Sequence, residues 1–278
     1  MQPKELQKVA EGREAEMFAW EGGTILRLLR DPGGQAAIQR EAAAMTAASD
    51  RGVRVPAVHG LTTVEGRPGM IMERIDGPDL LGVIAARPWT VFRAGRICGE
   101  VQAQLHGAGA SSKLPPLRAS IWGRIESSTR IPDELARFAL GILNELPDGD
   151  SLCHGDFHPA NILMAGDTPV IIDWSNATRG DGSADVARTL VMLRMGEPPP
   201  GSPLLLRLLA MVARRLLTSA YLRAYRRIRP LDMALVERWV TARVAERIDE
   251  GIEEETAGLL KLLEERRASA ARSQRLPV

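Results

Sequence analysis

The chain has few of the residues and patterns that mark secreted, metal-binding or membrane proteins. Its 278 residues include only two cysteines, Cys98 and Cys153, which are far apart and lack the short spacing of a metal site. We expect both to be reduced thiols in a cytoplasmic protein. The segment that starts at Met1 has no apolar signal region, and the chain has no run of 18 apolar residues. We therefore expect no membrane contact.

Aromatic residues make up only 4% of the chain, and the net charge is only +1. A nearly neutral chain gives no overall electrostatic case for binding nucleic acid. The arginine-rich run over 204–229 is interpreted as a solvated helix face. The remaining composition, with 45% hydrophobic and 26% charged residues, is typical of a globular protein with one large domain or two lobes. No feature assigns an oligomeric state.

The most informative part of the chain is residues 154–174. The run His-Gly-Asp-Phe-His-Pro-Ala-Asn over 154–161 leads into a short apolar segment, 162–164. Turn-forming residues over 165–169 separate this segment from a second apolar run that ends in Asp173 and Trp174. Two β-forming runs on either side of Gly, Asp and Pro predict a tight hairpin.

The predicted hairpin would bring Asp156, Asn161 and Asp173 together, because the two ends of a hairpin lie side by side. Phosphoryl transfer from a nucleotide requires such a set: one Asp accepts or orients the proton of the attacking hydroxyl, while an Asn and a second Asp offer oxygen ligands to Mg²⁺. The spacing His-x-Asp-x-x-x-x-Asn, followed by Asp after an apolar strand, matches the catalytic pattern of protein kinases.

With Gly155 after His154, the run over 154–161 resembles the aminoglycoside phosphotransferase family of kinase-fold enzymes, which phosphorylate small molecules. The resemblance implies an α+β, two-lobed, protein-kinase-like fold. A small lobe over residues 1–75, with an antiparallel sheet and one main helix, would bind the nucleotide. A larger, mainly helical lobe over 76–278 would carry catalysis and bind the substrate.

The resemblance also implies an activity: transfer of the γ-phosphoryl group of ATP or GTP to a hydroxyl of a small molecule, extending in some relatives to antibiotic inactivation. Asp156 would be the catalytic base, and Asn161 and Asp173 would hold Mg²⁺. The acidic stretch 246–255 has two readings: it attracts a cationic acceptor, or it is a solvated acidic helix face.

In the first lobe, a strand–turn–strand pattern over 15–29 precedes a helix-forming segment over 35–49. By resemblance, Arg27 would hold the nucleotide phosphates, Ile25 would cover the base, and Glu41 would pair with Arg27. The backbone of Glu73 and Ile75 would bind the adenine.

Further elements are expected, most of them from local composition. The resemblance puts residues 10–14 in the place of a phosphate-binding loop, but they contain one glycine, so a plain surface turn is an equal alternative. The sequence predicts strands over 53–58 and 69–72 around a turn region at 62–68. It also predicts loops over 109–120 and 196–203 and a frayed end over 267–278.

Two other functions stay open. His154 and His158 together with Asp156 have metal-ligand chemistry, which would suit a metallohydrolase, although that reading leaves Asn161 and Asp173 without a role. The single glycine of 10–14 and the arginine at position 27 would also suit a catalytically idle nucleotide-binding protein with a regulatory role.

Overall fold

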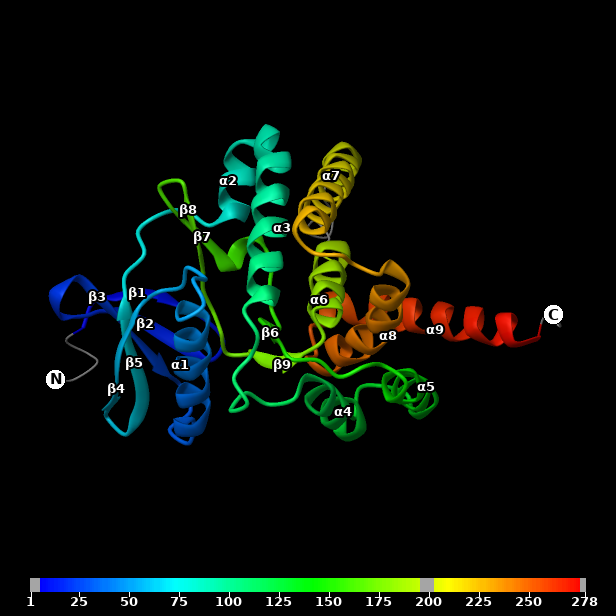
Figure 1. Cartoon of the computed structure of the whole chain (residues 1–278), viewed down its shortest axis with the longest axis horizontal. Coiled ribbons are helices and arrows are strands. Elements are labelled where there is room, and N and C mark those ends of the chain that lie inside the picture. The colour runs from blue at the N-terminus through cyan, green and yellow to red at the C-terminus, as the bar shows by residue number, and fades with distance from the viewer. Residues whose placement is uncertain (1–5, 196–202, 276–278) are drawn as a thin grey trace.

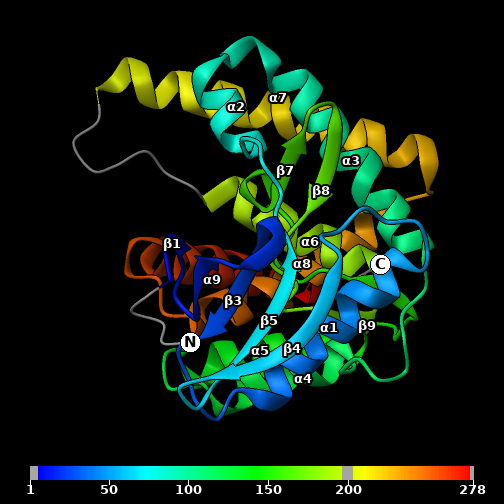
Figure 2. The same cartoon turned by 90° about the vertical axis from the view of Figure 1, so that its left-hand side faces the viewer.

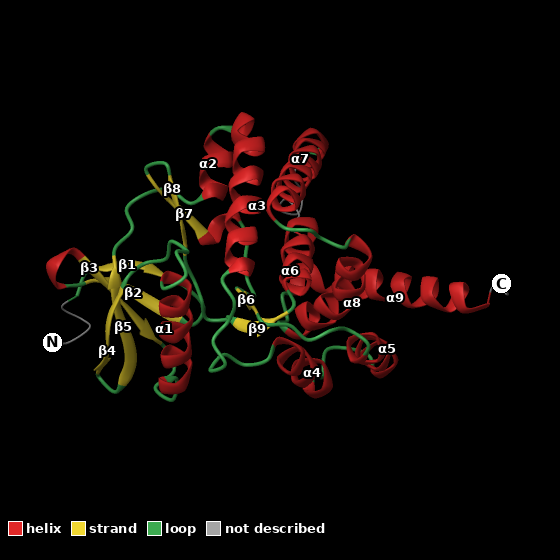
Figure 3. Ribbon diagram, viewed as in Figure 1, coloured by secondary structure: helices red, strands yellow, loops and turns green. Residues whose placement is uncertain are grey.

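The computed structural model describes residues 6–195 and 203–275. The loop predicted over 196–203 therefore lies outside the described residues, except for Pro203. A five-stranded sheet with one long helix forms one end of the molecule, and a larger group of helices forms the rest (Figures 1 and 3). This arrangement confirms the predicted α+β fold, with an antiparallel sheet followed by a mainly helical part.

The sheet is antiparallel throughout, and its strands lie in the order β1-β2-β3-β5-β4. The strands are β1 (Lys8–Glu11), β2 (Ala15–Ala19), β3 (Thr24–Leu29), β4 (Val58–Val64) and β5 (Arg67–Glu73). Helix α1 (Gln35–Ser49) lies between this sheet and the helical part (Figure 1). Its buried Ile38 and Met45 belong to the same apolar cluster as Leu29 and Met70 of the sheet.

Strand boundaries were the weakest predictions in this region. The strand predicted over 53–58 is wrong, because β4 begins only at Val58, and the predicted turn over 62–68 is largely strand. The reversal itself is confined to Glu65 and Gly66, which both have positive φ. Pro68 fits within β5 because β3 pairs with β5 only as far as Gly69.

The helical part follows β5 through a short connection. Its helices are α2 (Leu80–Ala86), α3 (Val91–Gly107), α4 (Leu117–Ser127), α5 (Asp133–Asn144), α6 (Gly182–Met195), α7 (Leu204–Ile228), α8 (Met233–Asp249) and α9 (Glu253–Arg275). Helices α3 and α7 approach closely because Gly95 and Gly99 of α3 lack a side chain at the contact. Helix α8 packs against the core through an apolar stripe that includes Val236, Val240 and Ile248, all fully buried.

Two predictions in the helical part are wrong. The loop predicted over 109–120 ends early, because α4 begins at Leu117 and buries Ile121 and Ile125 against the core. The frayed end predicted over 267–278 is helical as far as Arg275, because α9 continues from its buried residues Leu259 and Leu263. Residues 276–278 lie outside the described part.

The hairpin predicted within 154–174 is present. Strand β7 (Ile162–Ala165) pairs antiparallel with β8 (Thr168–Ile171), and Gly166 in the turn between them has a φ of 62°. The hairpin lies between the sheet and helices α2 and α3 (Figures 1 and 2). A second small ladder joins β6 (Ser151–Cys153) to β9 (Thr178–Gly180). In the described ranges, no helix is both long and apolar enough to cross a membrane.

Candidate active site

The hairpin brings its two ends together as the sequence predicted. Asn161 donates hydrogen bonds through Nδ2 to the backbone oxygen of Asp156, at 2.9 Å, and to its Oδ2, at 3.2 Å. The backbone nitrogen of Ile172 donates to the backbone oxygen of Asn161, at 3.0 Å, which joins the entrance of the hairpin to its exit. Asp173 therefore follows directly from a residue that is bonded to Asn161.

Asp173 has an unusual backbone conformation, with a φ of 61°. Asp is one of the few residues other than glycine that tolerate this region. Its Oδ1 accepts a hydrogen bond from Ser175 Oγ at 2.9 Å and lies 3.6 Å from Arg27 Nη2. The chain thus turns sharply at this residue and directs its carboxylate toward β3.

A cavity of about 240 Å³ lies between the sheet and the hairpin. Seven of the residues singled out in the sequence line it: Ile25, Arg27, Glu41, Glu73, Ile75, Asn161 and Asp173. Gly12 also lines it, so the single-glycine turn faces this cavity. Apolar side chains such as Met17, Met72 and Leu163 complete the walls, which suits a flat aromatic base at one end and charged groups at the other.

Arg27 and Glu41 form a buried ion pair. Arg27 Nε lies 2.9 Å from Glu41 Oε1 and 3.1 Å from Oε2, and the two side chains are 12% and 4% exposed. Burial alone would lower the pKa of Arg27, but the charges of Glu41 and Asp173 raise it, so Arg27 remains a cation. The pairing that the sequence suggested between positions 27 and 41 is thus present.

The oxygen atoms available for a divalent cation can be identified from the hydrogen bonds. Because Asn161 uses its amide nitrogen on Asp156, its Oδ1 accepts no hydrogen bond from the described residues. Asp173 Oδ2 likewise has no partner among the residues that the structure describes. Two oxygens beside this cavity fit the hard-ligand chemistry of Mg²⁺.

The Asp156 carboxylate faces two basic side chains. Arg188 Nη2 lies 3.5 Å from its Oδ1, and His158 Nε2 lies 3.5 Å from its Oδ2. Burial alone would raise the pKa of Asp156, but the His158 hydrogen bond and the Arg188 charge outweigh it and lower the pKa. Asp156 is therefore ionised at neutral pH and can accept a proton or a hydrogen bond.

Asp185 holds the loop that carries Asp156. Its buried carboxylate accepts hydrogen bonds from the backbone nitrogens of His154, at 3.1 Å, and Gly155, at 2.8 Å, and from the side chains of Gln102 and His106, at 3.0 and 3.1 Å. Asp185 thus braces this loop and does not cap α6. The side chain that accepts from the start of α6 belongs to Asp181, which bonds the Ser183 nitrogen at 2.6 Å.

His154 is engaged on both ring nitrogens. Nε2 lies 3.0 Å from the backbone oxygen of Ile172, and Nδ1 accepts from the backbone nitrogen of Asp156 at 3.2 Å. Burial lowers the pKa of His154, which favours the neutral ring. The ring therefore links the loop to the hairpin exit, and the geometry gives no support to His154 as a metal ligand in a hydrolase site.

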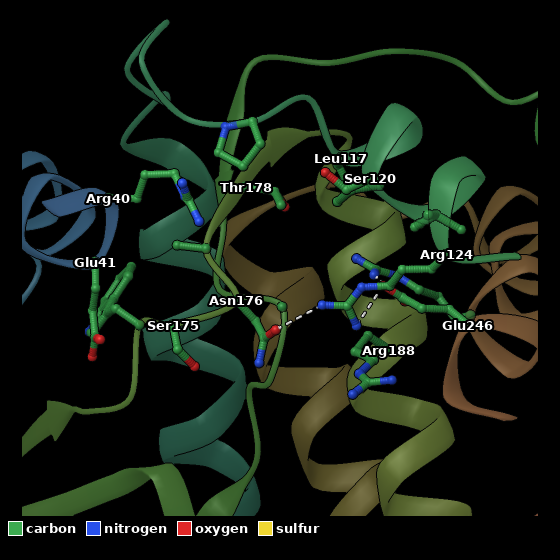
Figure 4. A pocket seen from close by; sticks show the side chains of 16 residues that line it. Arg40, Glu41, Leu117, Ser120, Arg124, Ser175, Asn176, Thr178, Arg188 and Glu246 are labelled. Carbon is green, nitrogen blue, oxygen red and sulfur yellow. Dashed lines mark hydrogen bonds and ion pairs between the residues drawn. The ribbon is translucent and has the colours of Figure 1, made fainter. Parts of the chain in front are cut away.

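A second cavity, of about 360 Å³, lies beside the same loop and is lined by Gly155 and residues 174–178 (Figure 4). Arginines from four different helices line its walls: Arg40, Arg124, Arg188 and Arg243. Sequence reasoning identified none of them as site residues. Only Arg188 could have been identified from the sequence, because it lies one helical turn after Asp185 and so on the same face of α6.

The acidic stretch 246–255 is only in part the solvated helix face that the sequence offered as one reading: Glu253 and Glu254 are exposed, but Glu246 is not. Glu246 is only 6% exposed, lines the second cavity and lies 2.7 Å from Arg243 Nη1. Burial alone would raise the pKa of Glu246, but Arg243, Arg188 and Arg124 lower it. At least this residue of the stretch is a buried, ion-paired carboxylate.

Comparison with known proteins agrees with this geometry. A model of the Phosphotransferase enzyme family matches residues 5–231, and the chain belongs to that family. No curated protein sequence matches the chain.

Solved structures with the same fold include a thermostable mutant of aminoglycoside phosphotransferase APH(4)-Ia in complex with ADP and hygromycin B. It is 16% identical with a TM-score of 0.64, over 98% of this chain and 95% of that one. The GDP and kanamycin complex of APH(2")-IIIa is 16% identical with a TM-score of 0.60, over 97% and 95%. APH(3'')-Id from Streptomyces rimosus is 18% identical with a TM-score of 0.58, over 85% and 91%. The two-lobed protein-kinase-like fold is thereby confirmed.

Proposed function

We propose that this phosphotransferase moves the γ-phosphoryl group of ATP or GTP to a hydroxyl of a small molecule. The observation that carries the proposal is the convergence of Asp156, Asn161 and Asp173 on one hairpin, with Asp173 3.6 Å from the buried Arg27–Glu41 pair. Two similar structures hold ADP or GDP beside an aminoglycoside, which supports a nucleotide and a hydroxylated acceptor as the two substrates.

In this proposal, residues 1–75 bind the nucleotide and residues 76–278 carry catalysis and bind the acceptor. Arg27, kept in place by Glu41, holds the phosphates in the 240 Å³ cavity, where Ile25 covers the base. The backbone of Glu73 and Ile75 offers hydrogen bonds to the base.

Asp156 receives the acceptor hydroxyl, orients it toward the phosphate and takes its proton. The lowered pKa of Asp156 keeps its carboxylate ionised, so that it can accept a hydrogen bond from the hydroxyl, but also makes it a weak base. Its main contribution is therefore to orient the hydroxyl, which suits a loose transition state in which positioning provides most of the rate. Asn161 and Asp173 would hold Mg²⁺, which neutralises charge on the phosphates when it is bound.

Cys98 and Cys153 are both free, buried thiols, as expected for the cytoplasmic location that we propose. Burial raises the pKa of the Cys98 thiol to about 12, and burial together with the charge of Asp185 raises that of Cys153. Neither thiol is poised for exchange or for forming a disulfide.

The test combines nucleotide binding with turnover. Asp156→Asn keeps the hydrogen bond from Asn161 but removes the base, so acceptor-dependent ADP formation should fall roughly 10²- to 10⁴-fold while binding of a fluorescent ATP analogue persists. Asp173→Asn, which tolerates positive φ, should abolish Mg²⁺-dependent turnover, as should Asp173→Ala, with the circular dichroism spectrum unchanged.

The rival function is a catalytically idle nucleotide-binding protein. Slow ATP hydrolysis that accelerates with a hydroxylated acceptor, antibiotics included, supports the enzyme. Tight nucleotide binding with no turnover across a broad panel of sugars, amino alcohols, hydroxy acids and aminoglycosides would establish the rival instead. Undiminished turnover by Asp173→Asn would remove the metal assignment.

A further inference from the structure

The second cavity is strongly basic for a site that would receive a small hydroxylated molecule. Gly155, next to Asp156, lines it, so the cavity adjoins the proposed base. Four arginines line it, against two carboxylates: Arg40, Arg124, Arg188 and Arg243, against Glu41 and Glu246. The formal charge of the lining is therefore +2, from four positive and two negative side chains.

Both carboxylates are already paired. Glu41 is bound by Arg27 on the nucleotide side, at 2.9 Å. Glu246 lies 2.7 Å from Arg243 and 3.7 Å from Arg124. Neither group is free to receive an ammonium of an acceptor without losing an arginine partner.

The neighbouring acids are neutralised in the same way. Glu250 lies 2.5 Å from Arg188 and 2.6 Å from Arg247, and Glu255 lies 2.7 Å from Arg247. Glu246, Glu250 and Glu255 therefore bind arginines of the protein itself, and their charge reaches the cavity only in weakened form.

The arginines, in contrast, have hydrogen-bonding capacity to spare. The Arg188 side chain is 3% exposed, yet its Nε and Nη1 have no hydrogen-bond partner among the described residues. The Nη2 of Arg243, whose side chain is 4% exposed, is also unpaired within the described part of the chain. Buried donors without acceptors are rare and costly, so each such group needs an explanation.

Arg124 and Arg40 add further positive charge at the edge of the cavity. Arg124 is 41% exposed and donates through Nη2 to Asn176 Oδ1 at 3.2 Å. Arg40 of α1 reaches toward the cavity from the opposite side (Figure 4). It has no ion pair among residues 6–195 and 203–275, so its charge is not offset locally.

We propose that the phosphate acceptor carries an anionic group, a carboxylate or a phosphate, which binds the free edges of Arg188 and Arg243 with Arg124 at the entrance. The inference rests on the proposed phosphotransfer function and assigns the acceptor class. Guanidinium groups match the paired oxygens of such anions, and charge-assisted bonds of this kind are strong. A polycationic acceptor would meet like charge instead.

The position of Arg188 also constrains the shape of the acceptor. Its Nη2 lies 3.5 Å from Asp156 Oδ1, while its Nε and Nη1 on either side of Nη2 have no partner among the described residues. An anion bound at one of these two donors places the reacting hydroxyl only a few bonds away. A short hydroxy acid or a small sugar acid or sugar phosphate has this geometry.

The binding test uses three probes on one carbon skeleton: malonate, 1,3-propanediol and 1,3-diaminopropane, with inorganic phosphate as a fourth. Calorimetry on the full chain saturated with AMP-PNP and Mg²⁺, at constant ionic strength, keeps the probes out of the nucleotide cavity. Malonate or phosphate should bind at least tenfold more tightly than the diol or the diamine. The tighter of the two identifies the anionic group as carboxylate or phosphate.

Arg124→Gln is the matched variant, because Arg124 is half exposed and does not touch Asp156. It should weaken anion binding about tenfold, the lower end for a bond to a charged group. Arg96→Gln is the control, since Arg96 is 56% exposed on α3 and, within the described part of the chain, pairs only with Glu100 at 3.6 Å. That change should alter binding less than twofold. Anion binding that equals diol binding, or that ignores Arg124→Gln, overturns the proposal.

A turnover assay separates this inference from the proposed function. Glycerate, glycerol, 3-amino-1,2-propanediol and glycerol 3-phosphate share one frame and differ in charge. Faster ADP formation with the anionic members, reduced by Arg124→Gln, supports the inference. Faster turnover of the amine, or of an aminoglycoside, would overturn the acceptor class and leave phosphotransfer standing. Failure to bind AMP-PNP would instead remove the proposed function.

Discussion

Asp185→Asn should be one of the most damaging single-atom changes in this chain. The carboxylate is fully buried and accepts four hydrogen bonds: Oδ1 from Gly155 and Oδ2 from His154, Gln102 and His106. Asn offers only one acceptor oxygen. In its best orientation that oxygen replaces Oδ2, and the amide group then faces the Gly155 nitrogen as a second donor.

The cost of Asp185→Asn follows from these contacts. One charge-assisted bond is lost outright, the Gly155 donor becomes unsatisfied, and the remaining bonds lose their charge. Losing a bond to a charged group costs about 1.5–3 kcal/mol, and unpairing a buried network costs about 3–5 kcal/mol. We expect a loss of about 3–5 kcal/mol in the free energy of unfolding. At about 2–4 °C per kcal/mol, the Tm should fall by about 10 °C.

Urea titration and calorimetry of Asp185→Asn measure this loss directly. Asp150→Asn is the control, because its side chain is 86% exposed and lies 3.4 Å from Arg179, so its stability should stay within about 0.5 kcal/mol of the original. Because Asp185 holds the Asp156 loop, kcat should also fall in the surviving folded protein, with the nucleotide KM little changed. A stability within about 1 kcal/mol of the original would refute the bracing argument.

Three further predictions follow from single contacts. Gly99→Ala would place a Cβ 2.3 Å from the backbone oxygen of Tyr221 and should lower the free energy of unfolding by about 1–3 kcal/mol. Gly123→Ala, with open space around it, should instead stabilise α4 by up to about 1 kcal/mol. Chemical denaturation measures both changes. Because the pKa of His154 is lowered in the folded chain, the unfolded chain binds a proton below about pH 6.5 while the folded chain does not. The free energy of unfolding should therefore fall with decreasing pH by up to about 1.4 kcal/mol per pH unit. Denaturant titrations from pH 7.5 to 5.5 should show a shallower slope in His154→Gln, and an unchanged slope contradicts this. Arg27→Met should weaken nucleotide binding about 10- to 100-fold by fluorescence titration, and Arg27→Lys should restore most of it; equal affinities would remove Arg27 from the phosphate site.

The sequence was most informative where chemistry and local structure depend on the same few residues. The hairpin over 162–171 was predictable because its turn and its flanking β-forming runs are contiguous, and closing it necessarily brings Asn161 near Asp173. The pairing of Arg27 with Glu41 was accessible only through a known arrangement of strand and helix. Nothing in the spacing of 14 residues specifies it.

Strand and helix ends were less predictable because they are decided by tertiary contacts. The composition of 53–57 favours a strand, but only β4 from Val58 onward finds a partner in β5. Helix α4 begins directly after two prolines, and its apolar residues Ile121 and Ile125 are buried only in the folded chain, by contacts with other parts of the core. Helix α9 persists as far as Arg275 because Leu259 and Leu263 dock its first half.

The charge of the second cavity could not be predicted from the sequence, because charge balance is a property of the fold. Along the chain, residues 246–255 look like an acidic surface. In space, Arg243 from the same helix, Arg188 from α6 and Arg124 from α4 converge on Glu246 and Glu250 and outnumber them. Removing the acidic partner rather than the arginines tests the sign of this balance: Glu250→Gln should free Arg188 and increase affinity for malonate. A decrease would mean that Glu250 orients Arg188 for the anion more than it competes with the anion.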